Sequence, residues 1–420
     1  MLDPRQALRK ILDNVRILSA ERAALADACG RVLSRDLIAR LDLPPFHNSA
    51  MDGYAVRAHD CRRASQKSPA VLRLKGVVAA GASPPAVQVP RALRTAGASP
   101  RIKVMPGEAA KIMTGAPPPE GADAVVRKEW TQEDPGGLVR IFHAPRRGDC
   151  IRFRGEDIRK GRKLLSRGAP LRPYEISLLA AQGISSVTVI RKPAVSILST
   201  GDELAGPAGP AAYGKIRDSN GPALAAALAQ AGISGLNGGI FPDDPVILTK
   251  AFKKFLERSD LMLITGGVSV GDYDYTRKLL ERIGIKVVFW KVAIKPGKPL
   301  LFGRRGRKLV FGLPGNPLSA LVCFEEFVRP ALEKMQGLRP ETFRYLHQGR
   351  LLNTYIKERR RAQCLFARAS GRPERFKVRI LLPQGSALLA RAARANAMAW
   401  GPLGVRRLKK GDKILFRWLK

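Results

Sequence analysis

Short apolar runs alternate with amphipathic segments in the middle of the chain. The apolar runs, each of strand length, cover 195–199, 261–265, 287–290 and 309–311. Segments with apolar residues at helical spacing lie at 222–231, 245–258, 275–283 and 317–335. Strands that alternate with helices form a mostly parallel sheet with helices on both of its faces. We therefore predict a doubly wound α/β domain over 192–336.

The flanking segments have different patterns. Helical spacing over 4–40, including 21–33, ends at Pro44, since proline lacks the backbone donor that a helix needs. Short β-like runs between turn residues predict a small, mostly-β domain over 49–151, with a long exposed loop in 81–107. Residues 152–191 return to helices and turns, and the arginine-rich segment 337–420 predicts a last small β domain.

The net charge of the chain is +39, with 74 Lys and Arg against 35 Asp and Glu. The excess is spread over the chain and is strongest in 339–420, where 21 basic residues face 4 acidic ones. Such a charge fits a nucleic acid or an acidic protein partner. Aromatic residues, which would stack on bases, make up only 6% of the chain. We favour a generally basic, solvated surface, with nucleic acid an unfavoured partner.

Composition also bounds the location and the metal chemistry. The chain has no signal-peptide pattern and no apolar stretch of about 18 residues, so we expect a cytoplasmic protein without membrane contact. The five cysteines are far apart and form no CxxC pair, which indicates reduced thiols. Only four histidines occur, none near another or near a cysteine, so a zinc site is not expected.

Polar residues follow the ends of the predicted strands, where ligands bind in open α/β sheets. They comprise the carboxylates Asp202, Glu203, Asp243, Asp244, Asp272 and Asp274 and the amines Lys291, Lys295 and Lys298. Gly266, Gly267 and Gly271 would let backbone N–H groups approach an anion closely. Carboxylates, lysines and a hard cation such as Mg²⁺ together can hold a phosphate. Each motif alone is also compatible with a turn or a helix cap.

Seven motifs, in this order along the chain, resemble those of the molybdopterin molybdenumtransferase (MoeA-like) family. They are NSAMDGYA (48–55), IMTGA (112–116), RGEDI (154–158), STGDEL (199–204), GGVSVG (266–271), WKVAIKPGKP (290–299) and GLPGNP (312–317). The resemblance covers roughly 4–335, whereas the tail matches more loosely, around Gln384 and Asn396. The family's pattern therefore leaves the part played by the C-terminal domain in doubt.

The resemblance implies a four-domain subunit of an elongated homodimer. The lid at 49–151 would be inserted into a discontinuous N-terminal hinge domain made of 1–48 and 152–191, followed by the domains at 192–336 and 337–420. The enzyme would use adenylylated molybdopterin and molybdate, require Mg²⁺, and release AMP as molybdenum binds the dithiolene. The site would lie between the α/β domain of one subunit and the lid of the other. A separate molybdopterin adenylyltransferase would supply the substrate, and molybdoenzymes or their chaperones would accept the product.

The resemblance also implies roles for individual residues. Glu203, Asp243 and Asp274 would hold Mg²⁺, with Asp202 orienting the phosphoanhydride beside them. Lys291, Lys295 and Lys298 would bind phosphate or molybdate oxygens as point charges. The remaining implied residues cradle the pterin phosphate, shape the rim or close the site from the lid and hinge: Gly266, Gly267, Ser269, Gly271, Pro314, Gly315, Asn316, Pro317, Asp52, Thr114, Arg152 and Asp157.

Three other functions stay open on the sequence alone. A tungsten-inserting paralogue would have the same site, because tungstate and molybdate are tetrahedral dianions of nearly the same size. A scaffold that has lost the chemistry is disfavoured by the intact carboxylates and lysines. A nucleic-acid-binding protein is suggested only by the net charge, and a steep salt dependence with sequence or structure preference would identify it.

Overall fold

The computed structural model describes residues 1–420 except 81–101, 207, 209–211, 268–274, 341–343 and 420. The chain forms two compact units. The first comprises Met1–Ser34, Gly168–Ile176 and Ser186–Lys420, and the second comprises Arg35–Arg167 and Ser177–Ser185. Most of the predicted exposed loop at 81–107 lies outside the described residues, and the four-domain division stays a prediction.

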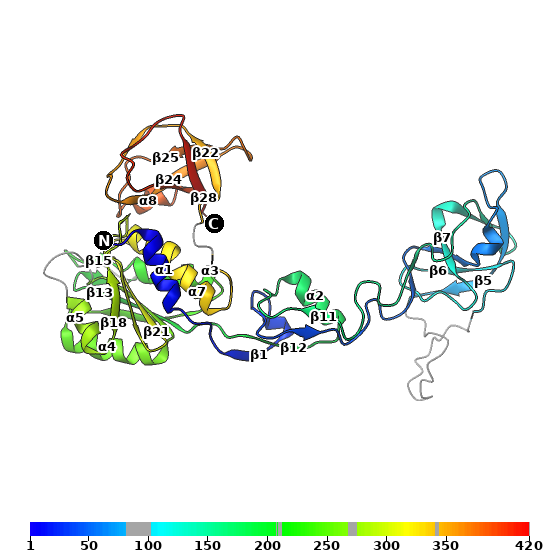
Figure 1. The fold of residues 1–420 in the computed structure, drawn as a ribbon, viewed down its shortest axis with the longest axis horizontal. Helices are drawn as coiled ribbons and strands as arrows, with labels where there is room; N and C mark the ends of the chain where they lie inside the picture. The colour runs from blue at the N-terminus through cyan, green and yellow to red at the C-terminus, as the bar shows by residue number, and fades with distance from the viewer. Residues whose placement is uncertain (81–101, 207, 209–211, 268–274, 341–343, 420) are drawn as a thin grey trace. The chain divides into compact units, whose positions relative to one another are not determined.

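A six-stranded sheet forms the centre of the first unit (Figure 1). Its order is β16 (Gly235–Phe241), β13 (Val195–Thr200), β17 (Leu261–Thr265), β21 (Lys308–Leu313), β20 (Leu301–Arg305) and β18 (Lys286–Trp290). The first four strands are parallel, and β20 is antiparallel to both of its neighbours. The four strands predicted from apolar runs are thereby confirmed; β16 and β20 were not predicted.

Helices pack on both faces of this sheet, which confirms the predicted doubly wound α/β fold. The core on one face joins Ile197, Leu263 and Phe311 to α1 (Pro4–Asn14), α3 (Asn220–Gln230), α6 (Pro317–Cys323) and α7 (Arg329–Met335). The core on the other face joins the alternate residues Leu198, Ile264 and Val310 to α4 (Pro245–Arg258) and α5 (Tyr275–Arg282). A π-helical turn, η5 (Phe324–Val328), connects α6 to α7.

The predicted helix over 21–33 is wrong. The structure has β1 (Ala20–Ala24) and a short 3-10 turn, η1 (Leu25–Asp27), in its place. β1 pairs with β12 (Ser186–Ile190) in an antiparallel ladder. This long-range pairing satisfies the backbone of a segment whose side chains have helical spacing, and tertiary context commonly overrides local propensity in this way.

The C-terminal segment forms a closed β-barrel, drawn in orange to red in Figure 1. Its order is β19 (Ile294–Lys295), β24 (Ala362–Ser370), β25 (Lys377–Ile380), β22 (His347–Leu351), β28 (Lys413–Trp418) and β26 (Ala397–Gly401), and a β24–β26 pairing closes it. β23 (Tyr355–Ile356) and β27 (Arg407–Leu408) pair beside it, and α8 (Leu389–Ala392) is a single turn. Because β19 follows β18 directly, the end of the α/β sheet leads into the barrel.

A third six-stranded sheet lies in the second unit. Its order is β7 (Ala124–Arg127), β4 (Gly53–Val56), β6 (Glu108–Ile112), β5 (Ala70–Val78), β9 (Leu138–Ile141) and β8 (Thr131–Asp134). The shorter elements of the chain are β2 (Leu37–Ile38) with β11 (Lys163–Leu165), β3 (Asn48–Ser49) with β10 (Ile151–Arg152), β14 (Leu204–Ala205) with β15 (Ile216–Arg217), η2 (Ala58–Cys61), η4 (Lys128–Trp130) and α2 (Pro173–Ala181).

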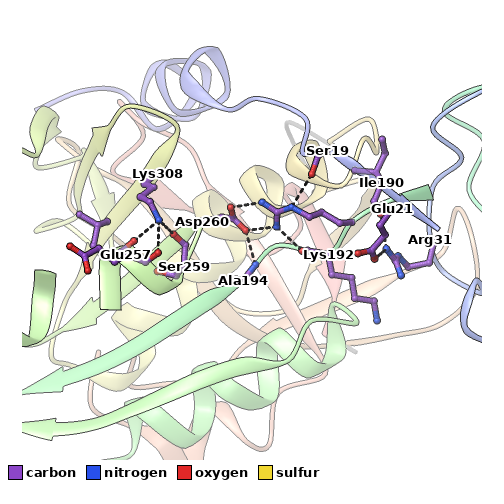
Figure 2. Close-up of polar contacts among 12 residues, drawn as sticks. Ser19, Glu21, Arg31, Ile190, Lys192, Ala194, Glu257, Ser259, Asp260 and Lys308 are labelled. Atoms are coloured by element: carbon purple, nitrogen blue, oxygen red, sulfur yellow. Dashed lines mark hydrogen bonds and ion pairs between the residues drawn. The ribbon is translucent and has the colours of Figure 1, made fainter. Parts of the chain in front are cut away.

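Two polar clusters fix the start of β17 in the α/β sheet (Figure 2). The guanidinium of Arg191, just after β12, donates two 2.6 Å hydrogen bonds to the carboxylate of Asp260. The Lys308 ammonium donates to the carbonyls of Leu256, Glu257 and Ser259, which end α4.

Over the parts of the chain that the structure describes, no helix is both long and apolar enough to span a membrane.

Candidate functional site

The ends of β13 and β17 meet the turn that follows β21. Gly266 has a φ of +89°, and a Cβ there would lie 2.0 Å from the carbonyl oxygen of Thr200. Gly267 has a φ of +63°, and a Cβ there would lie 2.3 Å from the hydroxyl of Thr276. The Cβ position of Gly315 is 3.8 Å from the Cα of Gly266. At Gly266 and Gly267 a side chain would therefore clash with its neighbours, whereas Gly315 is in ordinary van der Waals contact with Gly266.

Three of the predicted carboxylates gather beside this turn. The backbone N–H of Asp243 donates to Oδ1 of Asp202 at 3.1 Å. Glu203 folds back over Gly201, where a Cβ would approach its carboxylate to 2.5 Å. Burial, together with the charges of Asp202 and Glu203, raises the pKa of Asp243. The end of β13 and the residues after β16 thus form an acidic group whose mutual repulsion a cation would relieve.

The chemistry of this group fits a hard divalent cation, since Mg²⁺ prefers carboxylate oxygens. Within the described ranges, however, no three His, Cys, Asp or Glu side chains are arranged to hold a metal ion. Asp274, which was predicted as the third ligand after Glu203 and Asp243, lies outside the described residues, as do Asp272, Ser269 and Gly271. The metal site therefore stays a prediction.

The raised pKa of Asp243 has a consequence for stability. A carboxyl whose folded pKa lies above its unfolded value destabilises the protein progressively as pH rises through both values. We expect Asp243→Asn to raise the melting temperature near neutral pH in EDTA, and this gain to vanish below about pH 4. Mg²⁺ should raise the melting temperature of the parent protein more than that of the variant. Thermal melts at several pH values check this, and a variant less stable than its parent near neutral pH would contradict it.

Two residues that the sequence analysis missed connect the strand ends to α3. The carboxylate of Asp218 accepts the Ser199 hydroxyl at 2.7 Å and the backbone N–H groups of Asn220 and Gly221 at 3.0 Å. The Asn220 amide donates to the Gly315 carbonyl at 2.8 Å, and its buried Oδ1 has no hydrogen-bond partner in the structure. The run Asp218-Ser219-Asn220 before a helix resembles an ordinary cap, so only the contact with Gly315 distinguishes it.

A cavity of about 210 Å³ lies between the α/β fold and the barrel, beside the same turn. Three cationic residues, Lys295, Lys298 and Arg361, line it. Its other lining residues are Pro296, Gly297, Pro299, Asn316, Ser319, Gln363, Cys364, Leu365, Phe366, Gln384, Gly385 and Ser386. The buried Oε1 of Gln363 has no hydrogen-bond partner in the structure. Small polar groups and three cations around one cavity suit an oxyanion.

Arg361, which the sequence analysis did not single out, is held in place by its neighbours. Its Nε donates to Oε2 of Glu358 at 3.0 Å. The Lys357 ammonium, with a side chain 4% exposed, lies 2.9–3.0 Å from the carbonyl oxygens of Glu358, Arg361, Pro402 and Val405. The hydrogen bond from Arg361, with the charges of Lys295 and Lys298, lowers the pKa of Glu358. Local sequence did not reveal this loop because the contacts come from distant barrel residues.

The other predicted residues of the first unit lie at or near this region. Lys291 does not line the cavity; its ammonium lies 3.6 Å from the centre of the Trp290 ring. Pro317 is the first residue of α6, where its missing N–H costs no hydrogen bond, and Pro314 follows β21 directly. Asp244 caps α4 by accepting the N–H groups of Val246 and Ile247, which matches the ordinary alternative for a carboxylate after a strand.

The predicted lid and hinge residues all lie in the second unit. Oδ1 of Asp52 accepts both the N–H and the hydroxyl of Thr114 at 2.7 Å, and the pKa of Asp52 is thereby lowered. The structure thus brings these two residues together. Arg152 pairs with Asn48 in the β3–β10 ladder, and Asp157 donates its backbone N–H to the Leu43 carbonyl. Both side chains are exposed, and their contribution to a shared site stays a prediction.

Comparisons with known proteins cover most of the chain. Residues 2–183 match the MoeA N-terminal region (domain I and II), and residues 196–334 match the probable molybdopterin binding domain. The molybdopterin molybdenumtransferase of Haemophilus influenzae is 38% identical over 80% of this chain and 78% of its own length. That of Bacillus subtilis is 37% identical over 78% and 73%. A molybdopterin biosynthesis MoeA protein structure from Pyrococcus horikoshii covers 100% of this chain and 99% of its own, with 31% identity and a TM-score of 0.77.

Proposed function

The chain belongs to the MoeA family and is a molybdopterin molybdenumtransferase, and we propose that it uses adenylylated molybdopterin and molybdate, with Mg²⁺, and releases AMP. The observation that carries this proposal is the cavity lined by Lys295, Lys298 and Arg361. It lies beside a turn, at Gly315 and Asn316, that also contacts Gly266 at the end of β17. An oxyanion in the cavity would therefore stand close to a substrate bound at the sheet edge.

In this proposal the cavity holds molybdate. Lys295 and Lys298 neutralise its charge as compact ammonium groups, and Arg361 can donate two hydrogen bonds in a fixed plane. Asn316, Ser319 and Ser386 line the same cavity and can orient the remaining oxygens. The buried Oε1 of Gln363 can accept a hydrogen bond from a protonated oxygen. The cavity thus binds and orients the oxyanion before it meets the pterin.

The sheet edge would hold the phosphoanhydride of the substrate. Backbone N–H groups near Gly266 and Gly267 can approach a phosphate closely because no side chain intervenes. Glu203, Asp243 and Asp274 would hold Mg²⁺, and Asp202 would orient the phosphoanhydride beside them; the ion would neutralise charge as the anhydride is cleaved. The work of the protein is then positioning and electrostatic stabilisation, without a covalent intermediate.

The assembly and partners are proposed on the family resemblance. We propose a cytoplasmic homodimer in which Asp52, Thr114, Arg152 and Asp157 of the second unit complete the site. A separate adenylyltransferase would supply the adenylylated substrate, and molybdoenzymes or their chaperones would take the product. Sedimentation of the purified protein tests the dimer, and a monomer at assay concentration would overturn that part.

The experiment that tests the function measures AMP release from adenylylated molybdopterin by the purified protein. We expect release that requires both Mg²⁺ and molybdate and that stops when EDTA removes the cation. Tungstate is assayed in parallel, and a strong preference for it would identify a tungsten-inserting enzyme with the same site. No release with either oxyanion, from folded protein that binds the pterin, would overturn the proposed reaction.

A further inference from the structure

Five exposed cations stand in register on one face of the barrel sheet. Strands β24, β25, β22 and β28 are neighbours in that order. Arg368 of β24 is directly opposite Arg379 of β25, and Lys377 of β25 is opposite Arg350 of β22. Arg350 is in turn opposite Lys413 of β28. Because directly paired residues share a face, as do residues two apart in a strand, these side chains form one patch of two adjacent rows, called here the cationic face.

Among the residues that the structure describes, no acidic side chain pairs with the cationic face. No carboxylate of the described residues lies within ion-pair distance of Arg350, Arg368, Lys377, Arg379 or Lys413. Two of the few carboxylates of the barrel region are engaged elsewhere, since Glu358 pairs with Arg361 and Asp412 accepts the N–H of Lys409. Like charges directly opposite each other destabilise a sheet, so the fold alone gives no reason for this arrangement.

We propose that the cationic face is a docking surface for an acidic protein surface. An anionic partner would remove the cross-strand repulsion that the isolated chain carries. The face also has an exposed leucine, Leu415, which is 37% exposed. It is two residues from Lys413 in β28 and therefore on the same face, opposite Gln348. A leucine among cations can contact the apolar part of a mixed protein surface, whereas a phosphate backbone offers it no apolar group.

The aromatic residues of these strands argue against a nucleic acid as the partner. His347, Phe376, Phe416 and Trp418 stack on one another with ring centres 5.3–6.2 Å apart. They occupy the alternate positions, which point away from the cationic face. Of the aromatic residues in these four strands, only Phe366 of β24 is on the side of the cations, and it packs against the core of the α/β fold. Bases of a single strand would therefore find few aromatic side chains to stack on beside the cations.

The proposal is independent of the proposed reaction, because none of the five cations lines the cavity or the strand-end turn. It is tested with a variant of the full chain that carries Arg350→Gln, Lys377→Gln and Arg379→Gln. The matched control carries Lys250→Gln, Lys253→Gln and Lys286→Gln, three exposed lysines of α4 and β18. Both variants lose three positive charges, so the net charge of this basic protein falls equally in the two. AMP release is measured in parallel and should stay at the parental rate in both.

The probe is a fluorescent decaglutamate peptide, with an oligothymidylate of equal charge for comparison. We expect the cationic-face variant to bind the peptide about tenfold more weakly than the parent, and the control to lose far less. Its melting temperature should equal or exceed that of the parent, because the variant removes like-charge pairs. Equal losses of peptide affinity in both variants would overturn the proposal, because the peptide would then be attracted by the overall positive charge of the protein. The face would instead be a nucleic-acid site if the parent binds oligothymidylate more tightly than the peptide and only the cationic-face variant loses that affinity.

Discussion

Replacing Lys295 with alanine is expected to lower molybdate-dependent AMP release by about 10²–10³-fold, the range found when one preorganised charge-stabilising group is removed. Lys295 lines the cavity with Lys298 and Arg361, and the two lysines lower the pKa of the neighbouring Glu358. Removing one of three cations leaves a doubly charged oxyanion undercompensated in a partly enclosed space. The oxygens of the oxyanion would also lose the point charge that orients them.

The control for this prediction is Lys286→Ala, which removes an exposed lysine from β18, the strand that precedes β19 in the chain. It should keep the parental rate. The Lys295→Ala protein should keep its melting temperature and its affinity for the adenylylated pterin, whereas its KM for molybdate should rise. Lys295→Arg should restore part of the activity, because the positive charge remains. Parental kcat and KM for molybdate in Lys295→Ala would show that the cavity does not bind the oxyanion.

Replacing Arg417 with methionine is expected to destabilise the barrel by about 3–5 kcal/mol, the usual cost of breaking a buried ion pair from one side. The guanidinium of Arg417 lies 3.3 Å from Glu325 and 3.0 Å from Glu326, both in the π-helical turn η5. Burial alone would lower the pKa of Arg417, but the charges of Glu326, Tyr345 and Glu325 outweigh it, so that pKa is raised. Burial raises the pKa of Glu326, and this effect is only partly offset by the charge of Arg417 and the hydrogen bond from the Tyr345 hydroxyl.

Loss of Arg417 would leave the largely buried Glu326 with the Tyr345 hydroxyl, 3.0 Å away, and the charge of Arg344 as partners. Urea unfolding followed by tryptophan fluorescence checks this, because Trp400 lies 5.1 Å from Tyr345 and Trp418 ends β28. Arg407→Met, at an exposed position of β27, is the matched control and should have little effect. Adding Glu326→Met to Arg417→Met should recover much of the loss, since an apolar pair replaces the ion pair. A single variant as stable as the parent would show that the pair contributes nothing.

The elements of the α/β domain could be predicted because their signals are local. A buried strand such as Leu261–Thr265 is a short apolar run, and α4 (Pro245–Arg258) begins with a capping aspartate and a proline. The same rule failed over 21–33, where apolar residues at helical spacing belong to a strand. The ladder that decides between helix and strand there joins Ala20 to Ile190, which no local pattern contains.

The candidate site divides in the same way. The predicted residues Gly266 and Gly315 lie close together because the parallel strands before them end at one edge of the sheet, as a mostly parallel sheet implies. Arg361, Gln363 and Ser386 could not be found, because they enter the cavity from the barrel. Their positions depend on contacts such as those of the Lys357 ammonium with the Pro402 and Val405 carbonyls, more than forty residues away.

The sequence by itself determined the class of fold, the family, and which residue types stand at the ends of the parallel strands. Each of these follows from periodicity or from short motifs whose residues are neighbours in the chain. Only the tertiary structure decided which cations share a cavity, that Lys291 lies over Trp290 outside it, and that five arginines and lysines of the barrel form one patch. The reason is physical: charge acts through distance in space, and register and barrel closure set those distances between residues far apart in sequence.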